Sequence, residues 1–367
     1  MNLPPFKLER YFAKYEFNTE FLLCSSDCEA MPIADLLAME TGSAEKFQQT
    51  WLGYTESQGH PALRKEIAKI YETIQSEEIL VHTGAEEAIF LFMLATLKEN
   101  DHIIVHAPHY QSLSEIAKGM GCMVSPWRAR EENNWSLDLD ELRHLVRSST
   151  KAIVINTPHN PTGYLMSKSD FEAVNKFARE KNILLFCDEV YRESEYDPSL
   201  RLPAGADMGE HAVSLGVTSK TYGLAGLRIG WIATKNKTMY EKMAGLKDYT
   251  TICNSAPSEF LAEVALRNRH KLIARNVGII KSNLEIVDDL FARYSNLFEG
   301  SSRRWFDGIP KTAERNAEDF CDDLVKKSGV LLLPAHVRRF PQSLPHRAGT
   351  KKLPQAVERL DGYLTKN

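Results

Sequence analysis

The chain has 367 residues, with 45 Lys and Arg against 49 Asp and Glu, which gives a net charge of −4 near neutral pH. A hydrophobic share of 43% and a charged share of 26% are ordinary for folded proteins, so disordered and fibrous classes are excluded. This charge balance provides no cationic field, and we therefore expect no nucleic-acid and no membrane partner. No apolar run in the sequence approaches the roughly 18 to 20 residues of a membrane-spanning helix.

Two further features of the sequence bear on where in the cell the protein is found. The first residues, MNLPPFKLERYFAKYEF, lack the apolar centre of a secretory signal. Six cysteines in so long a chain do not suggest a disulfide framework. Together these features predict a cytoplasmic protein.

The middle of the chain alternates short apolar runs with amphipathic stretches. Strands are predicted at 77–83, 101–108, 123–127, 151–158, 182–190, 212–217 and 228–234, and helices at 86–99, 111–120, 139–148 and 168–181. Several strands are apolar on both faces, which is typical of a parallel or mostly parallel sheet between helices. Such sheets bind ligands at the carboxyl ends of their strands, so the residues just after each run are the candidates for a site.

From about residue 235 onward the pattern is mostly helical, with a long amphipathic stretch at 267–294. A helix at 317–328, a strand at 329–335 and a last helix at 354–365 follow. This order predicts a second, smaller α/β domain that packs with the N-terminal arm.

Lys220 follows an apolar strand in SLGVTSKTYGLAGLRIGW (214–231), and three glycines and Arg228 come shortly after it. Glycines allow the backbone to approach a bulky ligand, and an arginine can bind a phosphate through two hydrogen bonds. A lysine in such a loop can become a nucleophilic amine. A single lysine there is more often a surface residue, but polar residues also follow other strands.

Asp188 closes a nearly all-apolar strand, where a carboxylate needs a partner such as a protonated pyridine nitrogen. Asn160 lies in NTPHNPTG (156–163), a rigid turn after another strand, and could direct its amide at a ligand oxygen. TGAEEA (83–88) is a strand-to-helix junction, whose amides favour an anion. Alternatively, Asp188 caps the next turn, and TGAEEA is an ordinary helix start.

Five segments, TGAEEA, PHY (108–110), NTPHNPTG, DEVY (188–191) and SKTYGLAGLRIG (219–230), together resemble the ordered motifs of one family. This family is the fold-type I pyridoxal-phosphate-dependent aminotransferases of class I/II, the aspartate aminotransferase-like superfamily. GYTESQGHPALRKEI (53–67) is similar to its segment upstream of the cofactor loop. The resemblance covers roughly residues 50 to 235.

The resemblance implies a large domain with a mostly parallel seven-stranded sheet, at 41–265, and a small domain at 266–367. Residues 1–40 would form an N-terminal arm and part of the small domain. It also implies a homodimer that exchanges an amino group between an α-amino acid and a 2-oxo acid, with pyridoxal 5′-phosphate as cofactor. A lyase or other carbanion reaction on an amino acid, and a catalytically silent cofactor-binding protein, are the alternatives.

The resemblance also implies roles for the residues that contact the cofactor ring. Lys220 would form a Schiff base with the cofactor aldehyde and then move the proton during catalysis. Asp188 would keep the pyridine nitrogen protonated, and Asn160 and Tyr191 would hydrogen-bond the phenolic oxygen. Tyr110 would stack on the ring.

The phosphate would be held by Ala85, Glu86, Ser219 and Arg228, with Tyr54 reaching over from the second subunit. Two positions depart from the family pattern. The family has a small hydroxyl residue where Glu86 stands, so this side chain would have to turn away from the phosphate. It also tends to have Ser where Val217 stands, and Ser219 or Thr218 could substitute.

For the substrate, the resemblance implies contacts from Asn160 and from an arginine that binds the α-carboxylate. Arg347 is the arginine nearest to the position where the family pattern has this carboxylate-binding residue. The stretches at 299–314 and 336–350 differ most from the family pattern.

Two other groups of residues suggest metal or redox sites at first sight. His102 and His106 share a strand face, but their Cβ atoms would lie about 13 Å apart, which is too far for one ion. Cys24 and Cys28 have no second Cys or His pair at zinc-finger spacing, so ordinary thiols are expected. No metal site is predicted.

Overall fold

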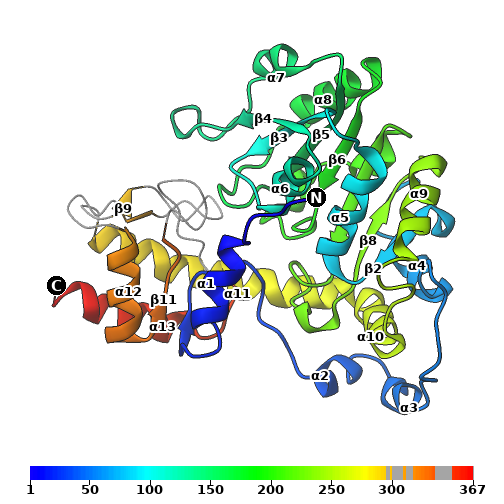
Figure 1. Ribbon diagram of the computed structural model, residues 1–367. Coiled ribbons are helices and arrows are strands. Elements are labelled where there is room, and N and C mark those ends of the chain that lie inside the picture. The colour runs from blue at the N-terminus through cyan, green and yellow to red at the C-terminus, as the bar shows by residue number, and fades with distance from the viewer. Residues whose placement is uncertain (295–297, 300–308, 311–316, 335–348, 367) are drawn as a thin grey trace. The chain divides into compact units, whose positions relative to one another are not determined.

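The computed structural model describes residues 1–294, 298–299, 309–310, 317–334 and 349–366 (Figure 1). Contacts divide the chain into two compact units. The first contains residues 1–3, 30–158 and 165–274, and the second contains residues 4–29, 159–164 and 275–367. The domain bounds drawn from the sequence, at 1–40, 41–265 and 266–367, stay predictions.

A seven-stranded sheet forms the centre of the first unit. Its strands are β2 (Ile79–His82), β3 (His102–Ala107), β4 (Met123–Arg128), β5 (Thr150–Asn156), β6 (Leu184–Asp188), β7 (Ala212–Val217) and β8 (Gly230–Ala233). They lie in the order β2-β8-β7-β6-β5-β3-β4. The neighbouring strands from β4 to β7 pair in parallel, and β8 runs antiparallel to both β2 and β7. The predicted mostly parallel, seven-stranded sheet is confirmed.

Helices lie on both faces of this sheet (Figure 1). They are α2 (Ile33–Leu37), α3 (Ser43–Gln48), α4 (Pro61–Ala68), α5 (Gly84–Thr96), α6 (Ser112–Gly119), α7 (Leu139–Leu145), α8 (Lys168–Glu180), α9 (Lys237–Lys247) and α10 (Ala256–Arg267). α5 contacts β7 and β8, with α6 and α9 beside it. The core that contains α4 and α10 takes up Ile79 and Val81 of β2. Because strand side chains alternate between faces, β2 is buried on both sides.

The second unit is built around short strands and helices. Its elements are α1 (Lys7–Tyr15), β1 (Phe21–Leu22), β9 (Phe298–Glu299), β10 (Ile309–Pro310), α12 (Ala317–Ser328), β11 (Val330–Leu331) and α13 (Leu353–Leu364). The long helix α11 (Arg269–Arg293) begins in the first unit and continues into the second. β1 pairs in parallel with β11, and β9 pairs antiparallel with β10. The strand predicted at 329–335 is therefore shorter than expected, because only two residues of β1 pair with it.

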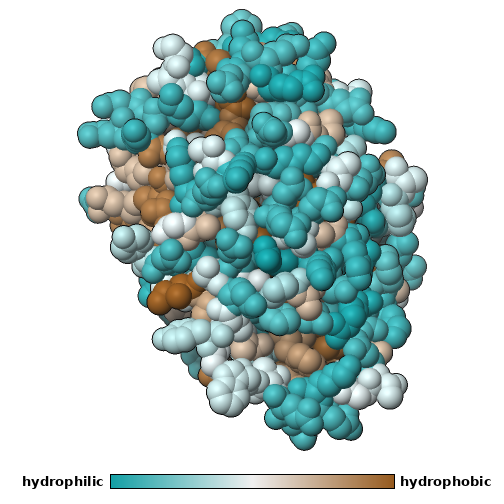
Figure 2. All heavy atoms as spheres, turned by 90° about the vertical axis from the view of Figure 1, so that its right-hand side faces the viewer, coloured by the Kyte–Doolittle hydropathy of each residue, from teal (hydrophilic) through white to brown (hydrophobic). Residues whose placement is uncertain are grey.

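Hydrophilic side chains cover most of the face shown in Figure 2, and apolar residues reach it in small separate patches. This distribution is ordinary for a folded domain. Within the described residues, no helix has both the length and the apolar character needed to cross a bilayer.

Candidate active site

The ends of five strands meet at the edge of the sheet where the sequence analysis placed its candidates. Asp188 is the last residue of β6 and pairs with Asn156 at the end of β5 and with Leu215 of β7. Gly230, the first residue of β8, pairs with Val217 on one side and with His82 on the other. Because β8 runs antiparallel, its beginning joins the carboxyl ends of β2 and β7 at this edge of the sheet.

Asp188 is a buried carboxylate, with 6% of its surface exposed. Its Oδ1 accepts a hydrogen bond from the backbone N–H of Val190 at 3.3 Å. Burial raises the pKa of Asp188 to about 7, and the charge of Lys220 partly opposes this rise. A cationic N–H group that reached this carboxylate would therefore be bound strongly by its ionised form.

The loop that carries Lys220 is folded tightly by its own backbone. The N–H of Thr218 donates to Ile229 O, that of Leu224 to Thr218 O, and that of Gly223 to Lys220 O, at 3.0 to 3.1 Å. Lys220 itself is half-buried. Asp188 ends β6 and Lys220 follows the neighbouring strand β7, so both residues lie at the same edge of the sheet.

Two glycines create a cradle at the start of α5. A Cβ on Gly84 would lie 2.7 Å from Nη2 of Arg228, and a Cβ on Gly230 would lie 2.6 Å from the carbonyl carbon of Gly84. Gly84 has a φ of +80°, and Arg228 has a φ of +52°, which turns its backbone out of the preceding short helix. The guanidinium of Arg228 is thus packed over the helix N-terminus, where backbone N–H groups and the helix dipole favour an anion. These residues fit a phosphate group.

The departures from the family pattern have a structural counterpart. Glu86 turns its Oε2 to the Ser112 hydroxyl, which donates to it at 3.1 Å. The Thr218 hydroxyl donates to Ile229 O at 3.1 Å and also lies 3.4 Å from Leu224 O, so the loop itself uses it. No hydrogen-bond partner contacts the Ser219 hydroxyl among the described residues. Ser219 is therefore the better placed of the two hydroxyl residues to donate to a ligand.

The other predicted residues lie in several places. Tyr191 is buried, with 4% exposed, three residues beyond Asp188, whereas Tyr110 is partly buried in the loop after β3. Ala85 is in the first turn of α5, and Tyr54 is 90% exposed on the first unit. Asn160 belongs to the 159–164 segment of the second unit. Arg347, and most of the divergent stretches at 299–314 and 336–350, lie outside the described residues.

One network beside the cradle, around the half-buried Glu87, was missed by the sequence analysis. Glu87 in the first turns of α5 accepts hydrogen bonds from the N–H of Thr83 at 2.7 Å and from the hydroxyls of Thr250 and Thr251. These bonds and His82 lower the pKa of Glu87 to about 2 despite its burial. The network ties the 250–254 segment to the cradle. The one local signal was an acid four residues after Thr83 at a helix start.

The histidine and cysteine candidates for a metal or redox site have other surroundings. His102 is fully buried, and its two ring nitrogens hydrogen-bond Thr150 Oγ1 at 2.8 Å and Ser125 Oγ at 2.9 Å, which links three strands. Cys24 and Cys28 are buried thiols. Over the part of the chain that the structure describes, no group of three His, Cys, Asp or Glu side chains is arranged to hold a metal ion.

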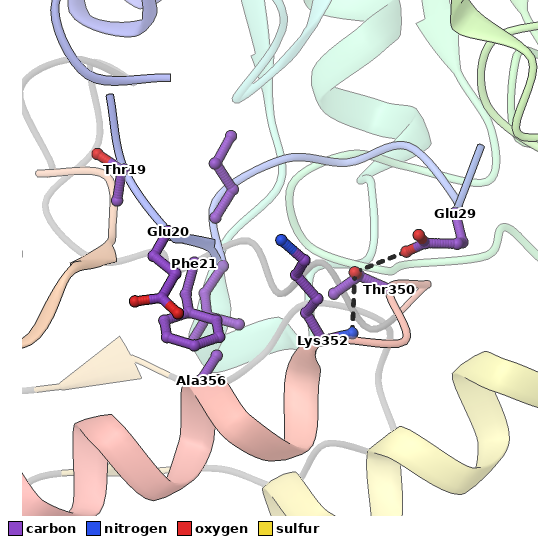
Figure 3. A pocket seen from close by; sticks show the side chains of 9 residues that line it. Thr19, Glu20, Phe21, Glu29, Thr350, Lys352 and Ala356 are labelled. Atoms are coloured by element: carbon purple, nitrogen blue, oxygen red, sulfur yellow. Dashed lines mark hydrogen bonds between the residues drawn. The ribbon is translucent and has the colours of Figure 1, made fainter. Parts of the chain in front are cut away.

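The second unit has a polar cavity of about 270 Å³ between its N-terminal segment and the start of α13 (Figure 3). Thr350 lies at its edge, where its hydroxyl donates to Glu29 Oε2 at 2.7 Å and accepts from the N–H of Lys352 at 3.2 Å. The described residues that line this cavity include none of the predicted site residues.

Comparison with known proteins assigns this arrangement to a family. The family model described as aminotransferase class I and II matches residues 20–345. An aspartate aminotransferase of Sulfurisphaera tokodaii is 27% identical, over 80% of this chain and 76% of its own. A capreomycidine synthase of Streptomyces vinaceus is 28% identical, over 91% of this chain and 87% of its own.

Solved structures agree with these relatives. A PLP-dependent aminotransferase of Streptococcus suis matches with a TM-score of 0.91 and 30% identity, over 100% of this chain and 99% of the other. A PLP-dependent cyclase, OrfR, matches with a TM-score of 0.88 and 25% identity, over 100% of this chain and 98% of the other.

Proposed function

We propose that Lys220 and Asp188 hold the reactive part of pyridoxal 5′-phosphate in this chain, which belongs to the class I and II aminotransferases. With this cofactor the enzyme exchanges an amino group between an α-amino acid and a 2-oxo acid. The observation that supports this assignment is that the buried Asp188 ends β6 and Lys220 follows the neighbouring β7, at the same sheet edge as the anion cradle.

Each residue has a chemical task in this proposal. When bound, the cofactor supplies an aldehyde that condenses with amines and a ring that takes up electrons from the substrate Cα. Lys220 would hold the cofactor through Nζ and, once the substrate amine has displaced it, its free amine would move a proton to or from the substrate Cα. Asp188 accepts a hydrogen bond from the ring nitrogen and keeps it protonated. Asn160 and Tyr191 donate to the phenolic oxygen, and Tyr110 stacks on the ring.

The phosphate is assigned to the cradle. The N–H groups of Ala85 and Glu86 donate to its oxygens, together with the guanidinium of Arg228 and the hydroxyl of Ser219. The Glu86 carboxylate stays on Ser112, away from the phosphate. Arg347 remains the predicted partner of the substrate carboxylate.

Borohydride reduction of the holoenzyme, followed by peptide mass mapping, tests the assignment. We expect the cofactor to be fixed to Lys220, and a Lys220→Ala variant should carry no label and lose turnover while it keeps its fold. A neighbouring lysine in the same unit, Lys235, supplies the control: Lys235→Ala should be labelled on Lys220 like the wild type. A label on any other lysine would reject the assignment.

A second reaction class is favoured by one observation. The relatives include a capreomycidine synthase and a structure named a PLP-dependent cyclase, at coverage as high as that of the aminotransferases. Incubation with a ¹⁵N-labelled amino acid and an unlabelled 2-oxo acid distinguishes the two classes. Transfer of ¹⁵N to the 2-oxo acid supports transamination, whereas loss of the amino acid without transfer indicates elimination or cyclisation.

We also propose that the protein is a homodimer in the cytoplasm. Five large apolar or aromatic side chains are exposed in two segments of the first unit: Trp51 (85%), Leu52 (81%), Tyr54 (90%), Tyr249 (90%) and Ile252 (51%). The segments are adjacent, because the hydroxyl of Thr55 donates to Asn254 O at 3.3 Å. Such a patch is suited to a second copy of the chain, and Tyr54 would then reach the phosphate of the partner.

A further inference from the structure

The segment that follows Asp188 is joined to the segment that follows Lys220 by direct hydrogen bonds. The hydroxyl of Thr221 donates to Arg192 O at 2.8 Å and lies 3.4 Å from Val190 O. The hydroxyl of Tyr222 donates to Oε2 of Glu193 at 2.8 Å. The two residues after the lysine therefore each contact the turn that carries Tyr191.

Glu193 has a backbone conformation that side chains rarely adopt. Its φ is +71°, and only 6% of the residue is exposed. A buried residue other than glycine keeps such a conformation only where its surroundings hold it there. The Tyr222 hydroxyl is one such restraint on Glu193.

Two arginines supply the opposing charge. Oε1 of Glu193 lies 3.6 Å from Nη1 of Arg201 and 4.0 Å from Nε of Arg269. Arg201 also donates through Nε to Oε2 of Glu195 at 2.9 Å. The two guanidinium groups therefore face Oε1 of Glu193, while Oε2 accepts the hydrogen bond from the Tyr222 hydroxyl.

We propose that Tyr222 and Glu193 are positioning residues for the reaction, an inference that rests on the proposed roles of Lys220 and Asp188. The Tyr222–Glu193 bond fixes the distance between the lysine loop after β7 and the turn after β6. The lysine amine must reach the cofactor while Asp188 and Tyr191 hold the ring. An error in either loop would therefore misalign the amine without abolishing the binding of the phosphate.

A purely structural role for the bond has to be distinguished from positioning. The chain offers a matched control in the second unit, where the hydroxyl of Tyr363 donates to Oδ2 of Asp323 at 2.6 Å. Tyr363→Phe and Tyr222→Phe each remove one tyrosine hydroxyl from a carboxylate. Both should lower the temperature of thermal unfolding, but only Tyr222→Phe should affect the chemistry.

The experiment compares the wild type and these two variants as purified holoenzymes and as apoenzymes. For Tyr222→Phe we expect kcat to fall roughly ten- to a hundredfold while KM stays within about threefold, since a small misplacement costs about this much. The rate at which the apoenzyme captures pyridoxal phosphate on Lys220, trapped by borohydride, should fall in parallel. Tyr363→Phe should leave both quantities within about twofold of the wild type.

Equal kcat and equal trapping rates for Tyr222→Phe and wild type would overturn the positioning role, even if the variant unfolds at a lower temperature. If Tyr222→Phe does not fold, Glu193→Gln replaces it, because this change removes the carboxylate that accepts from the Tyr222 hydroxyl at nearly constant volume. The same split between kcat and KM is expected from it, and unchanged kinetics would again overturn the proposal. A wild-type label on another lysine would instead reject the proposed function itself.

Discussion

Asp188 is a carboxyl group at the buried end of β6, and its ionised form destabilises the protein when no ligand cation contacts it. Asp188 has 6% of its surface exposed, and its pKa is raised to about 7 by burial although Lys220 lies near it. The fold therefore holds this carboxyl where its ionised form is costly. In the proposed site a protonated ring nitrogen would offset the cost, and the cofactor would then bind partly at the expense of the stability of the apoenzyme.

Replacement of Asp188 by Asn should make the apoenzyme more stable and the enzyme inactive. The folded-state pKa, about 7, is above the ordinary aspartate value of 3.8, so the native state holds the proton more tightly. The unfolding free energy of the wild type should then fall as pH rises from about 4 to 7. The difference between Asp188→Asn and wild type should be near zero at pH 4 and grow to at most roughly 4 kcal/mol above pH 7.

Urea unfolding of both apoenzymes at a series of pH values measures this difference, and kcat of the holoenzymes tests the catalytic loss. If Asp188→Asn is no more stable than the wild type at pH 8, the ionised carboxylate of Asp188 does not destabilise the apoenzyme. Retained turnover would contradict its role with the ring nitrogen.

At the scale of elements, the cradle depends on how closely β8 approaches α5. A Cβ on Gly230 would lie 2.6 Å from the carbonyl carbon of Gly84 and 2.9 Å from the amide nitrogen of Ala85. Both are backbone atoms, which cannot swing aside as a side chain can. Any side chain at Gly230 must therefore push the helix N-terminus away from Arg228.

Gly230→Ala should lower the affinity for pyridoxal phosphate by about tenfold or more. It should also destabilise the protein by about 1 to 3 kcal/mol, the usual cost of overpacking. Gly245→Ala is the control, since a Cβ there meets nothing within 4 Å in the interior of α9. That change should stabilise the protein by about 0.5 to 1 kcal/mol. Cofactor titration and thermal unfolding give both results, and unaltered affinity in Gly230→Ala would count against the cradle.

The sequence predicts the elements better than the contacts between them. The strands that end at Asp188 and before Lys220 are continuous apolar runs, and this local pattern is enough to locate both residues. The partners of Glu87 in the 250–254 segment are about 160 residues away, and the partner of Glu193 on α11 is also distant. No periodicity signals such pairs, because they form only when the chain has folded.

At the scale of the whole molecule, the exposed segments that contain Tyr54 and Tyr249 are attached to the cradle. The side chain of Asn254 accepts from the Thr83 hydroxyl at 3.4 Å and donates to Glu259 Oε1 at 2.9 Å. Its backbone carbonyl accepts from Thr55, directly after Tyr54. A surface that packs against a second copy would therefore be continuous with the helix start proposed to bind the phosphate.

This continuity leads to a test of shared sites by subunit mixing. If Tyr54 reaches the partner's phosphate, Tyr54→Ala should weaken cofactor binding about ten- to a hundredfold, the usual effect of losing a hydrogen bond to a charged group.

A Lys220→Ala subunit still carries an intact Tyr54, and a Tyr54→Ala subunit still carries an intact Lys220. Each mixed dimer then contains one complete site. Equal amounts that re-associate at random should recover about a quarter of the wild-type sites. The assay is turnover at a pyridoxal phosphate concentration that saturates the wild type but not Tyr54→Ala. Activity that stays at the mean of the two separate variants would mean that Tyr54 serves its own subunit or no site at all.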